Sequence, residues 1–377
     1  MEFGIFNGLY VPDEVAAVNP RAEHDRLHDE VALVVAADKA GFKYTWATEH
    51  HFLTEYSHLS ANESFLAYAA AKTERIHLGS GIFNLTPPVN HPARIAERVA
   101  MIDLLSSGRF ELGVGRGSST TEQLGFGISD PELTREMVDE VLPELKKMWR
   151  DEDYSHDGRF FSMPARNVLP KPFAKPHPPL WMAAGSPSTF EKAAKLGVGV
   201  LCFSAVGPDA LAPLIEKYKK EVVNAEPVGE YVNDNVMVTT QMLCLEDGHR
   251  AREEFLRMGT AYHQTLVFRY LDTFPRPPEL PAWPFIIPEP TADELEERIA
   301  SRLTCVGDPD EVGEAMQVYE RIGADQVVFG MLSSLVPIEL AVEAVETFGR
   351  HVIPRYDTDP VHRSTRHREA WLAAQTG

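Results

Sequence analysis

The stretch Tyr44-Thr45-Trp46-Ala47-Thr48-Glu49-His50-His51-Phe52 begins with a short apolar segment and ends with a carboxylate and two imidazoles in adjacent positions. Ahead of it, apolar residues of 22–40 recur every three to four positions, and Gly41 follows. This spacing predicts an amphipathic helix over 22–40 that stops at Gly41, and the apolar run predicts a strand over 44–47. Helix, strand and polar loop in this order indicate an α/β protein.

The same alternation of strand and helix continues along the chain. Strands are expected at 2–6, 44–47, 76–81, 110–115, 180–184, 199–203, 235–245 and 326–329. Helices are expected at 22–40, 64–72, 92–105, 134–150, 188–196, 208–224, 250–270 and 337–351. Eight such units favour a closed (β/α)8 TIM barrel over an open doubly wound sheet. We therefore expect one barrel domain over residues 1–377.

Three segments fall outside this alternation. Residues 151–179 are rich in Pro, Gly and aromatics and are too long for a plain connection, so they predict an insertion such as a β-hairpin after strand four. Residues 272–292 are proline-rich and predict a lid or insertion after strand seven. Residues 355–377 predict a polar C-terminal tail.

Composition excludes several classes of partner. A net charge of −20 over 377 residues disfavours nucleic acid and anionic membrane, because both are polyanions. No apolar run is long enough to span a bilayer, and no signal peptide is visible, so we expect a cytoplasmic protein. Cys202, Cys244 and Cys305 lie far apart in apolar contexts, so neither a disulfide framework nor a zinc site is indicated.

A barrel of this kind carries its chemistry at the carboxyl ends of its strands. Glu49, His50 and His51 follow the second strand directly, and imidazole titrates near neutral pH, which indicates proton transfer or metal binding. Adjacent residues of an extended segment point to opposite sides, which makes one metal ion bound by both histidines unfavourable, and we expect no metal. The alternative is a polar turn in which one histidine pairs with Glu49.

Two further rim segments predict an anion site. Arg116 follows strand four within Gly113-Val114-Gly115-Arg116-Gly117, and Gly185-Ser186-Pro187-Ser188-Thr189 precedes a helix after strand five. A helix N-terminus with hydroxyls and a nearby guanidinium can bind phosphate. The alternatives are a plain N-cap and a salt bridge of Arg116 to a rim carboxylate. The glycine runs lack the third glycine of a dinucleotide fingerprint, so we expect no Rossmann-type NAD site.

Several motifs, in this order and at nearly this spacing, resemble the bacterial luciferase-like flavin-dependent monooxygenase family. They are Gly41-Phe42, Trp46-x-x-Glu49-His50-His51-Phe52, His91-Pro92-Ala93-Arg94, Leu104-x-x-x-Gly108-Arg109-Phe110, Gly113-Val114-x-Arg116-Gly117, Ala184-x-Ser186-x-Ser188-Thr189 and Val306-Gly307-Asp308-Pro309. The resemblance covers residues 1–130 strongly and 179–354 more weakly. Each motif alone is moderately specific, and their ordered combination carries the resemblance.

The resemblance implies a (β/α)8 barrel that uses reduced FMN and O2, through a C4a-peroxyflavin, to oxygenate a small organic substrate such as an aldehyde or ketone. It implies a separate NAD(P)H:flavin reductase that supplies FMNH2. It also implies a homodimer or homotetramer formed through the helices expected at 64–72 and 92–105.

The resemblance also implies roles for individual residues. His50 would assist proton transfer at the flavin, with Glu49 and His51 as neighbours. The FMN would be held by Arg116, Gly115, Gly185, Ser186, Ser188, Thr189 and Gly81. The family often has a non-proline cis peptide near 79–83, beside the isoalloxazine. Candidates for the substrate wall are Phe6, Asn7, Phe83 and Phe203, with ordinary barrel packing as the alternative reading.

The chain departs from luciferase itself at two of these positions. Gly115 stands where the bioluminescent subunit has a reactive cysteine, and Gly185 replaces an acidic residue. We therefore do not expect light emission. Three alternatives stay open: a deazaflavin (F420)-dependent oxidoreductase with the same barrel, a metal-dependent barrel hydrolase using His50 or His51, and a non-catalytic flavin-binding subunit.

Overall fold

Eight parallel strands close into a barrel in the computed structural model, which describes residues 1–203, 206–273, 276, 280–331 and 336–376. The barrel strands are β1 (Glu2–Asn7), β2 (Tyr44–Ala47), β3 (His77–Ser80), β5 (Phe110–Gly115), β8 (Leu180–Ala183), β9 (Gly199–Cys202), β10 (Val236–Cys244) and β12 (Gln326–Phe329). Strand β10 pairs with both β9 and β12, and β12 pairs with β1, which closes the ring. The expected TIM barrel is confirmed.

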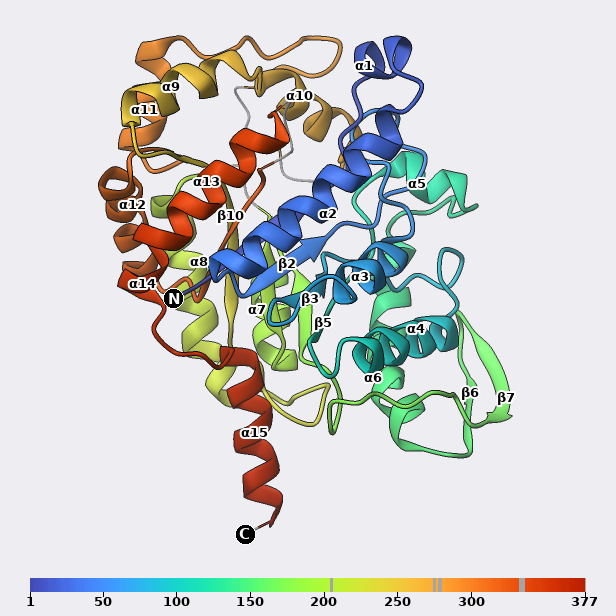
Figure 1. Ribbon diagram of the computed structural model, residues 1–377. Helices are drawn as coiled ribbons and strands as arrows, with labels where there is room; N and C mark the ends of the chain where they lie inside the picture. The colour runs from blue at the N-terminus through green and yellow to red at the C-terminus, as the bar shows by residue number, and fades with distance from the viewer. Residues whose placement is uncertain (204–205, 274–275, 277–279, 332–335, 377) are drawn as a thin grey trace.

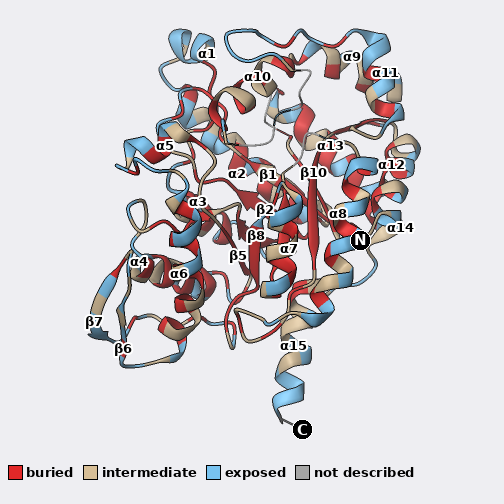
Figure 2. Ribbon diagram, turned by 180° about the vertical axis from the view of Figure 1, so that it is seen from behind, coloured by how far each residue is buried: buried red, intermediate tan, exposed pale blue. Residues whose placement is uncertain are grey.

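Helices surround this barrel (Figure 1). They include α2 (Ala22–Ala40), α3 (Asn62–Ala70), α4 (Pro92–Leu105), α6 (Leu133–Arg150), α7 (Pro187–Leu196), α8 (Pro208–Glu221), α12 (Pro309–Arg321) and α13 (Ile338–His351). In Figure 2 the strands form a buried centre, while the outer helix faces are exposed. Burial on both faces explains why apolar residues dominate most of these strands, although β3 and β5 also bury His77 and Glu111. Within the described residues, no helix is both long and apolar enough to cross a bilayer.

Smaller elements cover the two ends of the barrel or extend its loops. They are α1 (Asp13–Val18), β4 (Phe83–Asn84), α5 (Thr120–Gly125), β6 (Tyr154–Asp157), β7 (Ser162–Arg166), the 3-10 turn η1 (Val222–Asn224), α9 (Gly248–Arg257), α10 (Ala261–Tyr270), α11 (Ala292–Ala300), β11 (Thr304–Gly307), α14 (Ile353–Tyr356) and α15 (Arg363–Thr376). Strands β6 and β7 pair antiparallel within the insertion expected at 151–179.

The helix expected over 250–270 is wrong as one element. The structure divides it into α9 and α10 around Gly259, whose φ of +67° is left-handed and ends a helix. Strand β11 was not expected either. It pairs with the second half of β10, beyond the part of β10 that belongs to the ring. Its short apolar run Thr304–Gly307 stands between two helices and carries no alternation of its own.

Two tryptophans fill the interior of the barrel. Trp46 on β2 and Trp181 on β8 are fully buried and meet edge to face, with ring centroids 5.2 Å apart. Each ring lies where a neighbouring residue has no side chain: a Cβ on Gly79 would lie 2.2 Å from Trp46, and one on Gly199 would lie 2.4 Å from Trp181. The barrel is therefore a packed core below its rim, and any ligand must bind above it.

The insertion expected at 272–292 is described in part. Residues 274–275 and 277–279 lie outside the described residues. At its start, Asp272 accepts hydrogen bonds from the backbone and hydroxyl of Thr120, and Thr273 donates to the carbonyl of Ser118. The insertion is thus joined to the loop that follows β5.

The C-terminal tail is anchored at its start, because α15 begins inside the amino-terminal end of the barrel. His362 and Ser364 are buried, and the Ser364 hydroxyl donates to Glu111 Oε1 at 2.5 Å. His362 stacks on His77 with ring centroids 3.5 Å apart. The rest of α15 extends away from the body, at the end opposite α10 (Figures 1 and 2). The tail therefore closes the end of the barrel that faces away from the strands' carboxyl ends.

Candidate functional site

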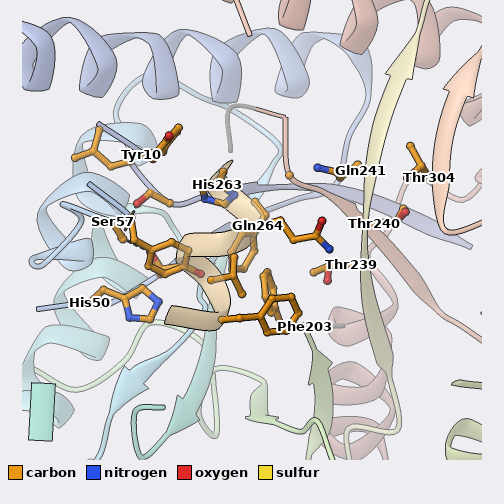
Figure 3. Close-up of a pocket in the computed structure, with 18 of the residues that line it drawn as sticks. Tyr10, His50, Ser57, Phe203, Thr239, Thr240, Gln241, His263, Gln264 and Thr304 are labelled. Atoms are coloured by element: carbon orange, nitrogen blue, oxygen red, sulfur yellow. Dashed lines mark hydrogen bonds between the residues drawn. The ribbon is translucent and has the colours of Figure 1, made fainter. Parts of the chain in front are cut away.

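A cavity lies at the carboxyl ends of β1, β2, β9, β10 and β12, under α10. The space between its walls is about 1070 Å³ and includes open solvent at its mouth. Figure 3 shows it running from His50 and Tyr10 to Gln241 and Thr304, with His263 and Phe203 between them. The carboxyl ends of barrel strands thus form a ligand site, as the fold predicts.

His50 lines this cavity, and its Nδ1 lies 3.2 Å from Oε1 of Glu122. A carboxylate only accepts, so Nδ1 carries a proton and the other nitrogen, Nε2, is the one available to a ligand. The backbone N–H of His50 donates to the carbonyl of Leu59, and the imidazole meets the ring of Tyr56 edge to face. The histidine is thus held at ring and backbone.

Glu122, on α5, is the partner that the sequence did not reveal. It is buried, and its Oε1 also accepts from the backbone N–H of His51 at 2.7 Å. Its Oε2 has no hydrogen-bond partner among the described residues, and neither does the side-chain amide of the adjacent Gln123. In the sequence, Ser119-x-x-Glu122 has the pattern of a capping box. This pattern explains Glu122 as part of a helix start, so nothing in the sequence indicated that Glu122 pairs with His50.

Glu49 and His51 do not line the cavity. Glu49 accepts hydrogen bonds from the backbone of Asn84 at 3.2 Å and from the side chain of Asn90 at 2.7 Å, and His51 Nε2 lies 3.1 Å from its Oε1. These contacts join the loop after β2 to the segment between β4 and α4. The side chains of Glu49 and His51 therefore bond to each other and to protein groups outside the cavity lining.

The structure brings the two predicted halves of the anion site to neighbouring strands. Arg116 follows β5 and the N-terminus of α7 follows β8, and these strands pair through Val114 and Met182. The hydroxyls of Ser188 and Thr189 each lie 3.1 Å from that of Ser186. Thr189 also accepts from the backbone N–H groups of Gly185 and Ser186. Three hydroxyls therefore converge at a helix N-terminus, where anions are stabilised.

Arg116 lacks an acidic partner in the part of the chain that the structure describes. Its Nη1 donates to the Thr134 hydroxyl at 3.1 Å, and no carboxylate comes within ion-pair distance. Burial lowers the pKa of Arg116, and Arg135 lowers it further, yet a guanidinium stays charged in proteins. The salt-bridge alternative for Arg116 finds no support among the described residues, and a partly buried cation without an acidic partner fits a phosphate.

A non-proline cis peptide joins Gly81 and Ile82, at the position where the resemblance placed one. Ile82 faces Gly115 across the strands, since a Cβ on Gly115 would lie 2.9 Å from its Cδ1. Ala183, at the end of the next strand, is exposed. Gly115 thus leaves room for the Ile82 side chain, and Gly81 for the ring of Phe6, since a Cβ on Gly81 would lie 3.3 Å from that ring.

Two of the four proposed substrate residues line the cavity. Phe6 and Phe203 do, with ring centroids 5.6 Å apart. Asn7 and Phe83 do not. The amide of Asn7 is fully buried and donates to Glu30, and the ring of Phe83 is fully buried beside Phe110. The alternative reading, barrel packing, applies to these two.

Helix α10 supplies the wall that the sequence did not predict. His263, Gln264, Val267 and Phe268 all line the cavity. The helix is held by a small apolar cluster in which Leu266, Val267 and Tyr270 pack with Tyr10 and Tyr56 from the loops after β1 and β2. Helical periodicity over 250–270 showed an apolar face but not what that face covers.

Among the described residues there is no group of three or more His, Cys, Asp or Glu side chains that could hold a metal ion.

Comparison with known proteins matches residues 1–326 to the family model described as luciferase-like monooxygenase. The chain is 26% identical to the oxygenase component of a flavin-dependent trigonelline monooxygenase from Acinetobacter baylyi, over 92% of this chain and 94% of that protein. It is 29% identical to an F420-dependent glucose-6-phosphate dehydrogenase from Beutenbergia cavernae, over 82% and 88%. The crystal structure of monooxygenase RslO1 from Streptomyces bottropensis superposes with a TM-score of 0.76 at 25% identity, covering 94% of this chain and all of that one.

Proposed function

This chain belongs to the luciferase-like monooxygenase family, and from that premise we propose that it is the oxygenase component of a two-component, FMN-dependent monooxygenase. The observation that carries the proposal is the arrangement of the rim. A partly buried guanidinium and a hydroxyl-rich helix N-terminus follow the neighbouring strands β5 and β8. A carboxylate-paired histidine lines a cavity at the carboxyl ends of β1, β2, β9, β10 and β12.

The residues present fit reduced FMN. Arg116 and the hydroxyls of Ser186, Ser188 and Thr189 would hold its phosphate, and the surface formed by Gly81, Gly115 and Gly185 would lie along the rest of the molecule. When bound, FMNH2 supplies the two electrons with which O2 delivers one oxygen atom to the substrate and the other to water. The protein's own contribution is binding, exclusion of water and proton transfer.

In this arrangement, His50 accepts a proton from a ligand in the cavity at Nε2, or donates one to it. With Nδ1–H donated to Glu122, the neutral ring presents Nε2 as an acceptor, and the carboxylate stabilises the ring when it becomes protonated. Phe6 and Phe203 on the rim and α10 above it exclude water from the same space. An aldehyde or ketone remains one substrate class that this cavity suits.

Two partners belong to the proposal. The similarity to an oxygenase component supports a separate NAD(P)H:flavin reductase that shares the cytoplasm with this chain. Exposed apolar side chains on α3 and α4 support a homodimer or homotetramer through these helices. They are Tyr68, Met101, Leu104 and Leu105.

The test is rapid mixing of the enzyme–FMNH2 complex with O2, following dissolved O2 and the absorbance of oxidised FMN together. We expect O2 to be consumed well before oxidised FMN appears, because the protein protects the oxygenated flavin from premature decay. Simultaneous O2 loss and FMN appearance at all pH values would contradict the monooxygenase assignment.

An F420-dependent oxidoreductase is the second candidate, favoured by the similarity to the Beutenbergia dehydrogenase. Binding titrations separate the two candidates. Tight binding of F420 together with negligible binding of FMNH2 would replace the first proposal with this one.

A further inference from the structure

The charge of the cavity under α10 differs from that of the whole molecule. The chain carries a net charge of −20, yet no carboxylate lines the cavity among the described residues. One arginine, Arg298 on α11, is among the residues that line it. Field lines concentrate in a cavity with apolar walls, so this single cation favours an anion over a cation as the ligand.

Arg298 is available to a ligand. Within the described part of the chain, its guanidinium forms no hydrogen bond or ion pair with a side chain. Glu294, one helical turn earlier, is held by the N-cap of α11, where its Oε2 accepts from the backbone N–H of Thr291 at 2.7 Å and from the Thr291 hydroxyl at 3.0 Å. A carboxylate that enters the cavity therefore meets a guanidinium without a competing acid in contact.

Flat rings form the walls of the same cavity. The imidazole of His263 lies parallel to the ring of Tyr56, with centroids 5.4 Å apart at 24°, and meets the ring of Tyr10 edge to face at 4.8 Å. Phe6 and Phe203 form a second aromatic pair. Burial lowers the pKa of His263 to about 3, so its ring is neutral and adds no second charge. Aromatic walls favour a planar ligand, because offset stacking needs two flat faces.

Taking the proposed function as its premise, we infer that the substrate of this cavity is a carboxylate carried on a flat, unsaturated ring. The ring lies against His263 and Tyr56, and the carboxylate faces Arg298. Arg298 and His263 thereby select the substrate, while His50 and the flavin site act on it.

Four probe compounds test this inference on the full-length, flavin-free protein: benzoate, benzamide, cyclohexanecarboxylate and benzylamine. Isothermal titration calorimetry gives the affinity of each. We expect benzoate to bind about tenfold more tightly than benzamide, which lacks the charge, and than cyclohexanecarboxylate, which lacks the flat ring. Benzylamine is expected to bind weakest.

Three variants assign the effect to residues. Arg298→Gln should weaken benzoate binding about tenfold and leave benzamide unchanged. His263→Leu should weaken both aromatic probes, and His263→Phe, which keeps a flat ring, should not. Arg302→Gln is the matched control, because Arg302 is a nearby arginine outside the cavity lining that bonds to Glu314. All variants are compared for thermal unfolding.

The inference is overturned if benzamide, cyclohexanecarboxylate or benzylamine binds as tightly as benzoate. It is equally overturned if Arg298→Gln leaves benzoate binding unchanged, or if benzoate does not bind at millimolar concentration. These measurements involve no flavin, so their failure is distinct from failure of the O2-mixing experiment.

Discussion

The two ends of the barrel treat their polar groups in opposite ways. At the end closed by α15, Glu111 accepts from the His77 ring at 2.7 Å, from the Ser364 hydroxyl at 2.5 Å and from the Trp181 indole at 2.7 Å. Lys43 bonds Glu2 at 2.8 Å, and Tyr44 donates to the other oxygen of Glu2. Glu111 and Glu2 therefore have protein partners on both of their oxygens. The side-chain amide of Gln326, at the start of β12, is an exception at this end, because it has no partner among the described residues.

At the open end, polar groups are left for something else. Arg116 has no acidic partner among the described residues. Within the same residues, Glu122 Oε2 and the side-chain amide of Gln123 have no hydrogen-bond partner. His50 presents Nε2 to the cavity. An unpaired buried polar group costs stability, and at the open end a bound ligand could supply the missing partner. We therefore expect substitutions at the closed end to change stability and substitutions at the open end to change activity. Single substitutions at either end test this expectation.

The largest effect is expected at the open end, from His50→Ala. Losing a positioned proton carrier should lower turnover of an accepted substrate by about 10²–10⁴-fold. Single-turnover product yield at saturating FMNH2 measures it. FMN affinity and thermal unfolding should stay near wild type, and His58→Ala, which removes a histidine outside the cavity that pairs with Glu23, is the control. Full turnover in His50→Ala would show that the open end does not act through this residue.

At the closed end, Glu111→Ala should cost stability and leave ligand binding alone. Three buried donors lose their acceptor, so the free energy of unfolding should fall by about 3 kcal/mol. Urea unfolding at pH 7 measures the loss, and Ser364→Ala, which removes one of the three donors, should cost less. A Glu111→Ala protein of wild-type stability would contradict the structural role of this end.

The pH dependence of stability in Glu111→Gln also tests the structural role of Glu111. Burial raises the pKa of Glu111 to about 7, so the native state holds this proton more tightly than the unfolded chain does. The resulting stabilisation is complete below pH 4.5 and is lost as pH rises through 7. Between pH 5 and 8, the wild-type free energy of unfolding should therefore fall by about 2 kcal/mol more than that of Glu111→Gln.

The comparison of the two pH series isolates Glu111 from other titrating groups. Glutamine keeps one acceptor for Trp181 and offers its amide to His77 and Ser364, so the network survives without the titration. Parallel pH dependences in the two proteins would mean that Glu111 titrates normally.

The smallest effect is expected from Arg116→Gln at the open end. Losing one charge-assisted contact to phosphate should weaken FMN binding about tenfold, while binding of riboflavin, which has no phosphate, should not change. Arg135→Gln, a neighbouring arginine on α6 that is largely exposed, serves as the control. Equal losses of affinity for FMN and riboflavin would mean that Arg116 does not bind the phosphate.

The strands and the site residues that directly follow them were predictable, because the sequence signals of both are local. Helix 22–40 and strands 44–47 and 326–329 were placed at their observed bounds from periodicity and glycine stops. Arg116, Ser186 and His50 follow strand ends, and the barrel rule places strand ends on the rim. Phe83 also follows a strand, but the sequence could not show that its ring turns into the core.

What the sequence by itself determined is therefore the barrel, the rim position of His50, and the positions of Arg116 and the hydroxyl-rich helix start after two strands. What only the tertiary structure decided is which distant residues meet. Glu122 reaches His50 across 72 positions, Ser364 reaches Glu111 across 253, and α10 and α11 bring His263 and Arg298 over the mouth. Periodicity reports how a segment faces a core, whereas closure of the barrel brings distant segments together, and no local pattern encodes that meeting.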